Sequence, residues 1–180
     1  MIFRRTLLAG VGGLICLPAT RSARAELPPI SMQQHERCMR LAIEEGRKNP
    51  YYPFGAVIVR PQTGEVLARG VNNSRENPIL HGEIACMNDY VRGHGNQGWT
   101  PLVLYTTGEP CSMCMSALVW AGIGGVVFAS SIEGIRNAGI SQIGITARQV
   151  ADASPFYRGL LIGGVLAEET DRMFLERKRN

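Results

Sequence analysis

Apolar residues recur with the period of an α-helix in residues 33–48, where Cys38, Leu41 and Ala42 share one side and charged residues fill the others. This spacing predicts an amphipathic helix that ends near Pro50, because proline cannot continue a helix. A short lead-in that contains two prolines precedes this first predicted element.

Short apolar segments separated by turn residues predict the strands of a sheet. Residues 55–59 and 65–71 flank a Pro-Gln-Thr-Gly turn and are typical of a β-hairpin. Three further strands are predicted over residues 102–106, 125–129 and 160–166, and four further helices over residues 80–92, 111–121, 146–153 and 168–177. A hairpin followed by alternating helices and strands predicts an α/β fold, with a mixed five-stranded sheet and helices on both faces. Residues 132–145 show no pattern that assigns an element to them.

The N-terminus has the features of a secretory signal peptide. Arg4 and Arg5 form a basic start, an apolar run follows, and Ala25 ends a small-residue cleavage site. The apolar run is too short to span a bilayer. The paired arginines resemble a twin-arginine signal, and an ordinary signal is the alternative. We therefore expect a signal peptide over residues 1–25, export to the periplasm, and one domain over residues 26–180 without stable membrane association.

Removal of the signal peptide changes the net charge of the chain. The full sequence has 19 Lys and Arg residues against 15 Asp and Glu residues, for a net charge of +4. Four of the arginines and none of the acidic residues lie in the signal, so the mature chain is close to neutral. A nucleic-acid binder normally has a basic surface, because each phosphate that it neutralises releases counterions. We therefore expect a small-molecule partner and no nucleic-acid partner.

Three residues have the types and the spacing of a metal site. His81, Cys111 and Cys114 supply three of the four ligands that zinc takes, which leaves one position for water as in catalytic sites. Two cysteines three residues apart at the start of a helix point the same way, and the helix N-terminus favours their thiolates. Glu83 is not needed as a ligand, so it is available to move protons beside the metal. The alternatives are a redox pair, a disulfide and a structural zinc; the proximity of Glu83 to His81 favours a catalytic zinc.

The segments HGE at 81–83 and PCSMC at 110–114 match the signature of zinc deaminases, H-x-E followed by P-C-x-x-C. With the segments PFGAVIV, GEVLARGVNN and EPCSMCMSALVWA, the chain resembles the cytidine deaminase-like superfamily over nearly its whole mature length. Within it, the chain is most similar to bacterial guanine deaminases and nucleoside deaminases. The resemblance implies a three-layer α/β/α sandwich, one Zn²⁺ per chain, and hydrolytic release of ammonia from a nucleobase or nucleoside with Glu83 as the catalytic residue.

The resemblance also implies substrate contacts and a homodimer. Asn72 would hydrogen-bond the base, and Gly82 would offer its backbone to the bound ring. One departure concerns Ser141 and Gln142, which stand where guanine deaminases have an acidic residue that helps to read guanine. The identity of the base therefore stays open. A tRNA-adenosine deaminase and a non-catalytic zinc or thiol protein are the alternative functions.

Several residues outside the signature have a structural interpretation. Cys38 and Cys86 are expected in the core, since a free cysteine packs as a small hydrophobic residue. His35 and His94 lie in ordinary polar settings and are expected at the surface. Three aromatic residues keep open roles, in the core, in a pocket wall or in a lid over the site: Trp120, Phe156 and Tyr157.

Overall fold

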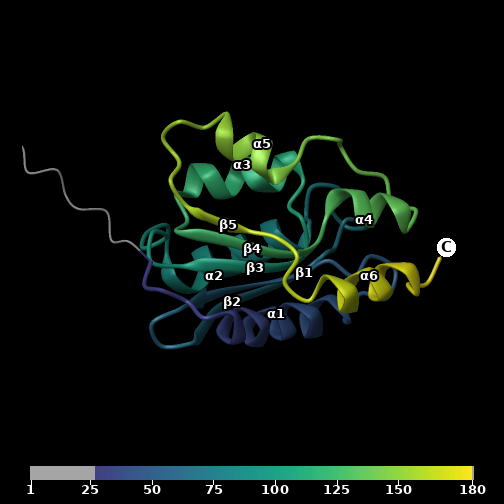
Figure 1. Cartoon of the computed structure of the whole chain (residues 1–180), viewed down its shortest axis with the longest axis horizontal. Helices are drawn as coiled ribbons and strands as arrows, with labels where there is room; N and C mark the ends of the chain where they lie inside the picture. Colours follow the sequence, from purple (N-terminus) through teal and green to yellow (C-terminus); the bar gives the residue numbers. More distant parts are fainter. Residues whose placement is uncertain (1–26, 180) are drawn as a thin grey trace, which may run out of the picture.

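The computed structural model describes residues 27–179, and its centre is a mixed five-stranded sheet between layers of helices (Figure 1). The strands are β1 (Gly55–Arg60), β2 (Glu65–Val71), β3 (Val103–Gly108), β4 (Gly125–Ser130) and β5 (Leu160–Ile162), in the order β2-β1-β3-β4-β5. β1 pairs antiparallel with β2 and β3, whereas β4 is parallel to β3 and to β5. The predicted hairpin and the predicted mixed sheet are confirmed.

Alternating side chains of the strands build a hydrophobic core on each face of the sheet. In β1, Ala56 and Ile58 belong to the core of one face, and Val57 and Val59 belong to the core of the other. The first face is covered by α2 (Gly82–His94), α3 (Ser112–Ala121) and α5 (Ala147–Asp152), and the second by α1 (Met32–Gly46) and α6 (Ala167–Leu175). This arrangement confirms the three-layer α/β/α sandwich.

Two predicted segments differ from the structure. The strand predicted over residues 160–166 is only three residues long, because Gly164 turns the chain with a φ of 86°. Residues 132–145, which the pattern left unassigned, contain the short helix α4 (Ile132–Asn137). The side chain of Ser131 caps this helix, and an irregular segment connects it to α5.

The buried polar residue His35 was predicted at the surface, and that prediction is wrong. His35 is only 3% exposed, and its Nδ1 atom lies 3.0 Å from the hydroxyl oxygen of Tyr105 on β3. A polar side chain can be buried where such a partner is present. His94 is exposed as predicted, Cys86 is fully buried, and Cys38 packs half-buried against the core of the α1 face. The four described cysteines are all free.

Glycine allows α2 to lie directly on the edge of the sheet. A Cβ atom added to Gly70 of β2 would lie 2.2 Å from the backbone nitrogen of Cys86 and 2.4 Å from the carbonyl oxygen of Gly82. Both distances are shorter than a carbon atom tolerates, so only glycine fits between the strand and the helix. This close approach fixes the first turn of α2 beside the end of β2 and the start of β1.

Residues 1–25, the predicted signal peptide, lie outside the described residues. None of the helices within residues 27–179 combines the length and the apolar character that a membrane span needs. Export therefore stays a prediction from the sequence.

We expect Gly70→Ala to lower the free energy of unfolding by about 1–3 kcal/mol, because overpacking at a buried contact forces backbone shifts. Urea denaturation followed by circular dichroism measures this change. Gly93→Ala is the matched control, since Gly93 lies in α2 with no atom within 4 Å of an added Cβ. The control should be neutral or slightly stabilising, and equal destabilisation of both variants would contradict the packing account.

Candidate metal centre and active site

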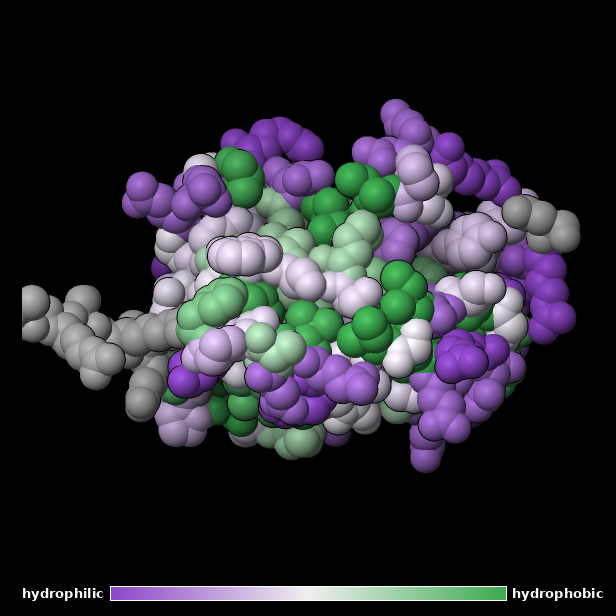
Figure 2. All heavy atoms as spheres, turned by 90° about the horizontal axis from the view of Figure 1, so that it is seen from above, coloured by the Kyte–Doolittle hydropathy of each residue, from purple (hydrophilic) through white to green (hydrophobic). Residues whose placement is uncertain are grey.

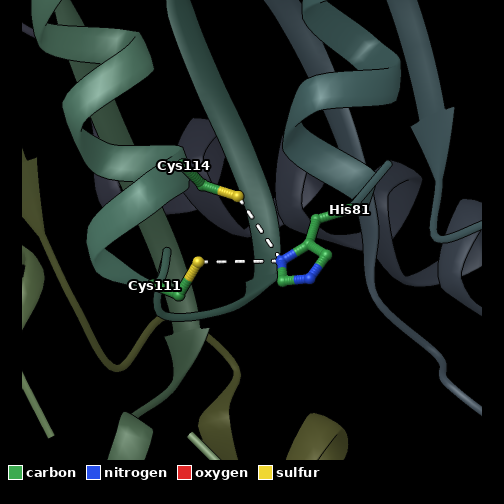
Figure 3. Close-up of side chains that lie close together, drawn as sticks. All are labelled: His81, Cys111 and Cys114. Atoms are coloured by element: carbon green, nitrogen blue, oxygen red, sulfur yellow. Dashed lines mark hydrogen bonds between the residues drawn. The ribbon is translucent and has the colours of Figure 1, made fainter. Parts of the chain in front are cut away.

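Three side chains at two helix N-termini converge on one point (Figure 3). His81 is the N-cap residue of α2, Cys111 is the N-cap residue of α3, and Cys114 lies in the first turn of α3. The Nδ1 atom of His81 lies 3.6 Å from the Sγ atom of each cysteine, and the three ligand atoms all lie within 4.8 Å of one another. The structure therefore brings the three predicted metal ligands together.

The distances between these atoms fit a tetrahedral zinc ion. Zinc bonds sulfur at about 2.3 Å and nitrogen at about 2.0–2.1 Å, so a tetrahedral angle separates the two atoms by about 3.6 Å. That is the separation found between His81 and each cysteine. Two sulfurs and one imidazole nitrogen are also a donor set that zinc prefers, and three protein ligands leave one coordination position for water.

Hydrogen bonding affects the pKa values of the two cysteines in opposite directions. A hydrogen bond from the Cys114 thiol, together with one from His81, lowers the pKa of Cys111 to about 4. The same hydrogen bond to Cys111, with burial, raises the pKa of Cys114. Cysteine binds a metal ion as the thiolate, so metal binding at both sulfurs releases protons.

Glu83 lies beside the metal ligands without being one of them. It belongs to the first turn of α2, two residues after His81, and is only 3% exposed. Thr106 of β3 donates a hydrogen bond from Oγ1 to the Glu83 carboxylate over 3.3 Å. Burial raises the pKa of Glu83. The carboxyl group is thus held at a fixed place next to the metal position, where it can exchange protons with a bound molecule.

A cavity of about 220 Å³ opens over this group. Its lining combines two metal ligands, two buried acids, two aromatic rings and a set of neutral polar and aliphatic side chains: His81, Cys111, Glu83, Glu109, Tyr52, Phe54, Asn72, Ser74, Ser141, Gln142, Ile140 and Ile143. The lining is therefore mixed, with apolar surface for a flat ring and several groups that can hydrogen-bond to its edge.

Only one of the two predicted substrate contacts, Asn72 and Gly82, lines this cavity. Asn72 lines it, and its Oδ1 atom accepts hydrogen bonds from the Ser74 amide at 3.1 Å and the Ser74 hydroxyl at 2.9 Å. These bonds orient the amide group of Asn72. Gly82 is buried and is not among the lining residues; a Cβ atom added there would lie 2.5 Å from the carbonyl oxygen of Phe54. A backbone contact of Gly82 with substrate stays a prediction.

Sequence reasoning missed six residues of the cavity lining, among them Glu109, Tyr52 and Phe54. Glu109 directly precedes the Pro-Cys pair of the signature, and this position was the signal that could have identified it. Tyr52 and Phe54 come from the irregular segment before β1 and carried no comparable signal. Their place depends on how that segment folds over the end of the sheet.

The open roles of the aromatic residues are settled by their positions. Trp120 is 78% exposed, so it is neither in the core nor in the cavity lining. Its ring lies 5.2 Å from that of Phe156, which is also exposed. Tyr157 is buried in the core next to α3 and α5. Neither Phe156 nor Tyr157 lines the cavity, and a lid formed by this pair is therefore absent from the described structure.

Comparison with known proteins relates this site to deaminases. Residues 32–130 match a family model described as the cytidine and deoxycytidylate deaminase zinc-binding region. The guanine deaminase of Bacillus subtilis is 33% identical over 106 residues, which cover 58% of this chain and 67% of that protein. A tRNA-specific adenosine deaminase of Streptococcus pyogenes is 29% identical over 159 residues, which cover 84% of this chain and 99% of that protein.

A similar fold is found among solved structures. A guanine deaminase from Nitrosomonas europaea superposes with a TM-score of 0.68 at 22% identity, covering 83% of this chain and 92% of that chain. The match to the family model extends over more than half of the sequence and includes His81, Glu83, Cys111 and Cys114. Because the family, the fold and the metal-ligand geometry agree, this chain belongs to the cytidine and deoxycytidylate deaminase zinc-binding family and is a zinc-dependent hydrolytic deaminase.

Proposed function

We propose that this enzyme removes the exocyclic amino group of a small nucleobase or nucleoside, as a guanine-deaminase-like aminohydrolase. The observation that carries this proposal is the cavity over the metal ligands. Its volume of about 220 Å³ is below the roughly 300–1,000 Å³ of sites for drug-sized ligands. A cavity of this size suits a single heterocyclic base, and its aromatic and amide side chains suit a flat ring with a polar edge.

Deamination of adenosine in tRNA is the second candidate, because tRNA-specific adenosine deaminases are among the similar proteins. The balanced charge of the mature chain favours a small-molecule substrate over tRNA. The mature chain carries as many basic as acidic residues, whereas a tRNA-binding protein gains affinity from a basic surface. The proposed export from the cytoplasm would also separate the enzyme from tRNA.

The chemistry divides between the metal and Glu83. When bound, zinc acts as a Lewis acid toward water, which is the nucleophile that hydrolysis consumes. Glu83 is proposed to accept one proton from this water and to donate it to a ring nitrogen. It then accepts the second proton, from the hydroxyl group that the water leaves on the ring carbon, and donates it to the departing ammonia. Thr106 fixes one of its oxygens for these transfers. Asn72, oriented by Ser74, is proposed to donate a hydrogen bond from its amide nitrogen to the base.

A homodimer is proposed for this enzyme. Exposed apolar side chains lie at the end of α3 and in the segments before and after α5, at Trp120, Ile143, Ile145 and Phe156. Figure 2 views the molecule from above, and apolar surface gathers there between charged edges. Trp120 and Phe156 belong to this exposed set. Large exposed apolar patches commonly mark protein interfaces. Sedimentation equilibrium would return the monomer mass if this proposal is wrong.

Glu83→Gln is expected to keep bound zinc and fold but to lower kcat by about 10²- to 10⁴-fold, the usual contribution of a general acid–base group. The assay is release of ammonia from a panel of purines, pyrimidines and triazines, with zinc content and circular dichroism measured on the same samples. Glu76→Gln, a substitution of an exposed acid, is the control and should retain wild-type turnover. Turnover of Glu83→Gln within a few-fold of wild type would remove Glu83 from the mechanism.

Export by the twin-arginine route is proposed as well, and it would deliver an already folded, zinc-loaded protein to the periplasm. Replacement of Arg4 and Arg5 together by lysine keeps the charge of the signal but removes the arginine pair. We expect this variant to stay in the cytoplasm as active enzyme, measured by fractionation and zinc content. Undiminished export would show that the export route does not recognise the arginine pair.

A further inference from the structure

Glu109 has an unusual position that the deamination chemistry does not use. It lies between β3 and the metal ligand Cys111, lines the cavity, and is only 7% exposed. Its Oε2 atom accepts a hydrogen bond from the backbone N–H of Ile132 at 2.9 Å, and its Oε1 atom accepts one from the backbone N–H of Ala147 at 2.8 Å. One buried carboxylate therefore binds two backbone segments that are distant from each other in the sequence.

The two N–H groups are the first of α4 and of α5. The opening N–H groups of a helix have no partner within the helix and need one from elsewhere. Each helix already has its own capping side chain, because Ser131 accepts from the Gly134 amide and Thr146 from the Gln149 amide. Glu109 binds a different N–H of each helix. Its contribution is thus to hold the two helix starts at a fixed separation.

Residues 138–146, here called the wall segment, run between these two helices. Four consecutive residues of the wall segment line the cavity: Ile140, Ser141, Gln142 and Ile143. Within residues 27–179, residues 141–145 make no backbone–backbone hydrogen bond. The path of the wall segment therefore depends on how its two ends are held, and Figure 1 shows it as an extended connection between α4 and α5.

We propose that Glu109 is a positioning residue that sets substrate affinity by holding the wall segment over the cavity. Its two oxygens are both engaged by backbone N–H groups, so it acts through the wall segment rather than by contact with substrate. Gln142 is the side chain of the wall segment best suited to read the substrate, because its amide both donates and accepts hydrogen bonds. This inference rests on the proposed function, since it concerns the substrate of the same cavity.

Glu109→Gln tests the role with little change of shape. The amide keeps one accepting oxygen, but its NH₂ group faces a backbone N–H and cannot accept from it. Loss of a hydrogen bond to a charged group predicts an increase in KM of about tenfold, with kcat within about twofold of wild type and one zinc retained. Glu133→Gln is the matched control, because it removes the same charge from the exposed first turn of α4. It should leave KM unchanged.

A double-mutant cycle with Gln142→Ala separates positioning from general stability. If Glu109 acts by placing Gln142, adding Glu109→Gln to Gln142→Ala should raise KM far less than it does in the wild-type background. If the double variant raises KM by the product of the two single-variant factors, the two residues act independently and the proposal is overturned. Loss of zinc, or a fall in kcat with KM unchanged, would also overturn it, because Glu109 would then serve the metal ligands.

Amide hydrogen exchange gives a test that needs no substrate. Glu109→Gln should speed exchange at the helix starts that Glu109 binds, Ile132 and Ala147, while exchange in β1 and β3 stays at the wild-type rate. Unchanged exchange at both positions would overturn the proposal. If the wild-type enzyme releases ammonia from none of the bases, that result counts against the proposed function. The exchange experiment needs no substrate, so its result still tests whether Glu109 holds the two helix starts.

Discussion

The structure depends on the convergence of two helix N-termini at one end of the sheet. α2 begins after His81 and α3 begins after Cys111, and the metal position lies between these two starts. The close contact at Gly70 sets the position of α2, and β3 leads into α3 through only a few residues. Zinc bond lengths tolerate deviations of about 0.2 Å. The 3.6 Å separations of the ligand atoms therefore require both helices to be held firmly by the sheet.

This constraint divides the active site into two parts with different physical origins. The floor of the cavity consists of the metal ligands and Glu83. These residues lie at the starts of α2 and α3, which a packed core keeps in place. One wall of the cavity consists of residues 138–146, which have little regular hydrogen bonding of their own. Segments of this kind vary more easily than helices and strands. On the proposed function, the floor carries the chemistry and the wall contributes to the choice of substrate.

The sequence predicted those features that short-range patterns determine. Glu83 follows His81 by two positions and Cys114 follows Cys111 by three, so local helix geometry alone brings each pair to one place. The continuous apolar run of residues 55–59 likewise predicted a strand, and in the structure its side chains are buried on both faces of the sheet.

Features that depend on distant partners could not be predicted in this way. His35 was expected at the surface because Tyr105, its partner in the core, is 70 residues away. Glu109 finds its two partners 23 and 38 residues further along the chain. The apolar pattern of residues 160–166 predicted a long strand, but the turn at Gly164 ends the strand and starts the path to α6.

Deamination at this site requires that His81, Cys111 and Cys114 hold one zinc ion and leave a position for water. X-ray absorption at the zinc edge of the purified enzyme measures this coordination shell. We expect two sulfur neighbours at about 2.3 Å, one imidazole nitrogen at about 2.0–2.1 Å and one further light atom. A shell of four protein ligands, or protein isolated without zinc and with a Cys111–Cys114 disulfide, would contradict it.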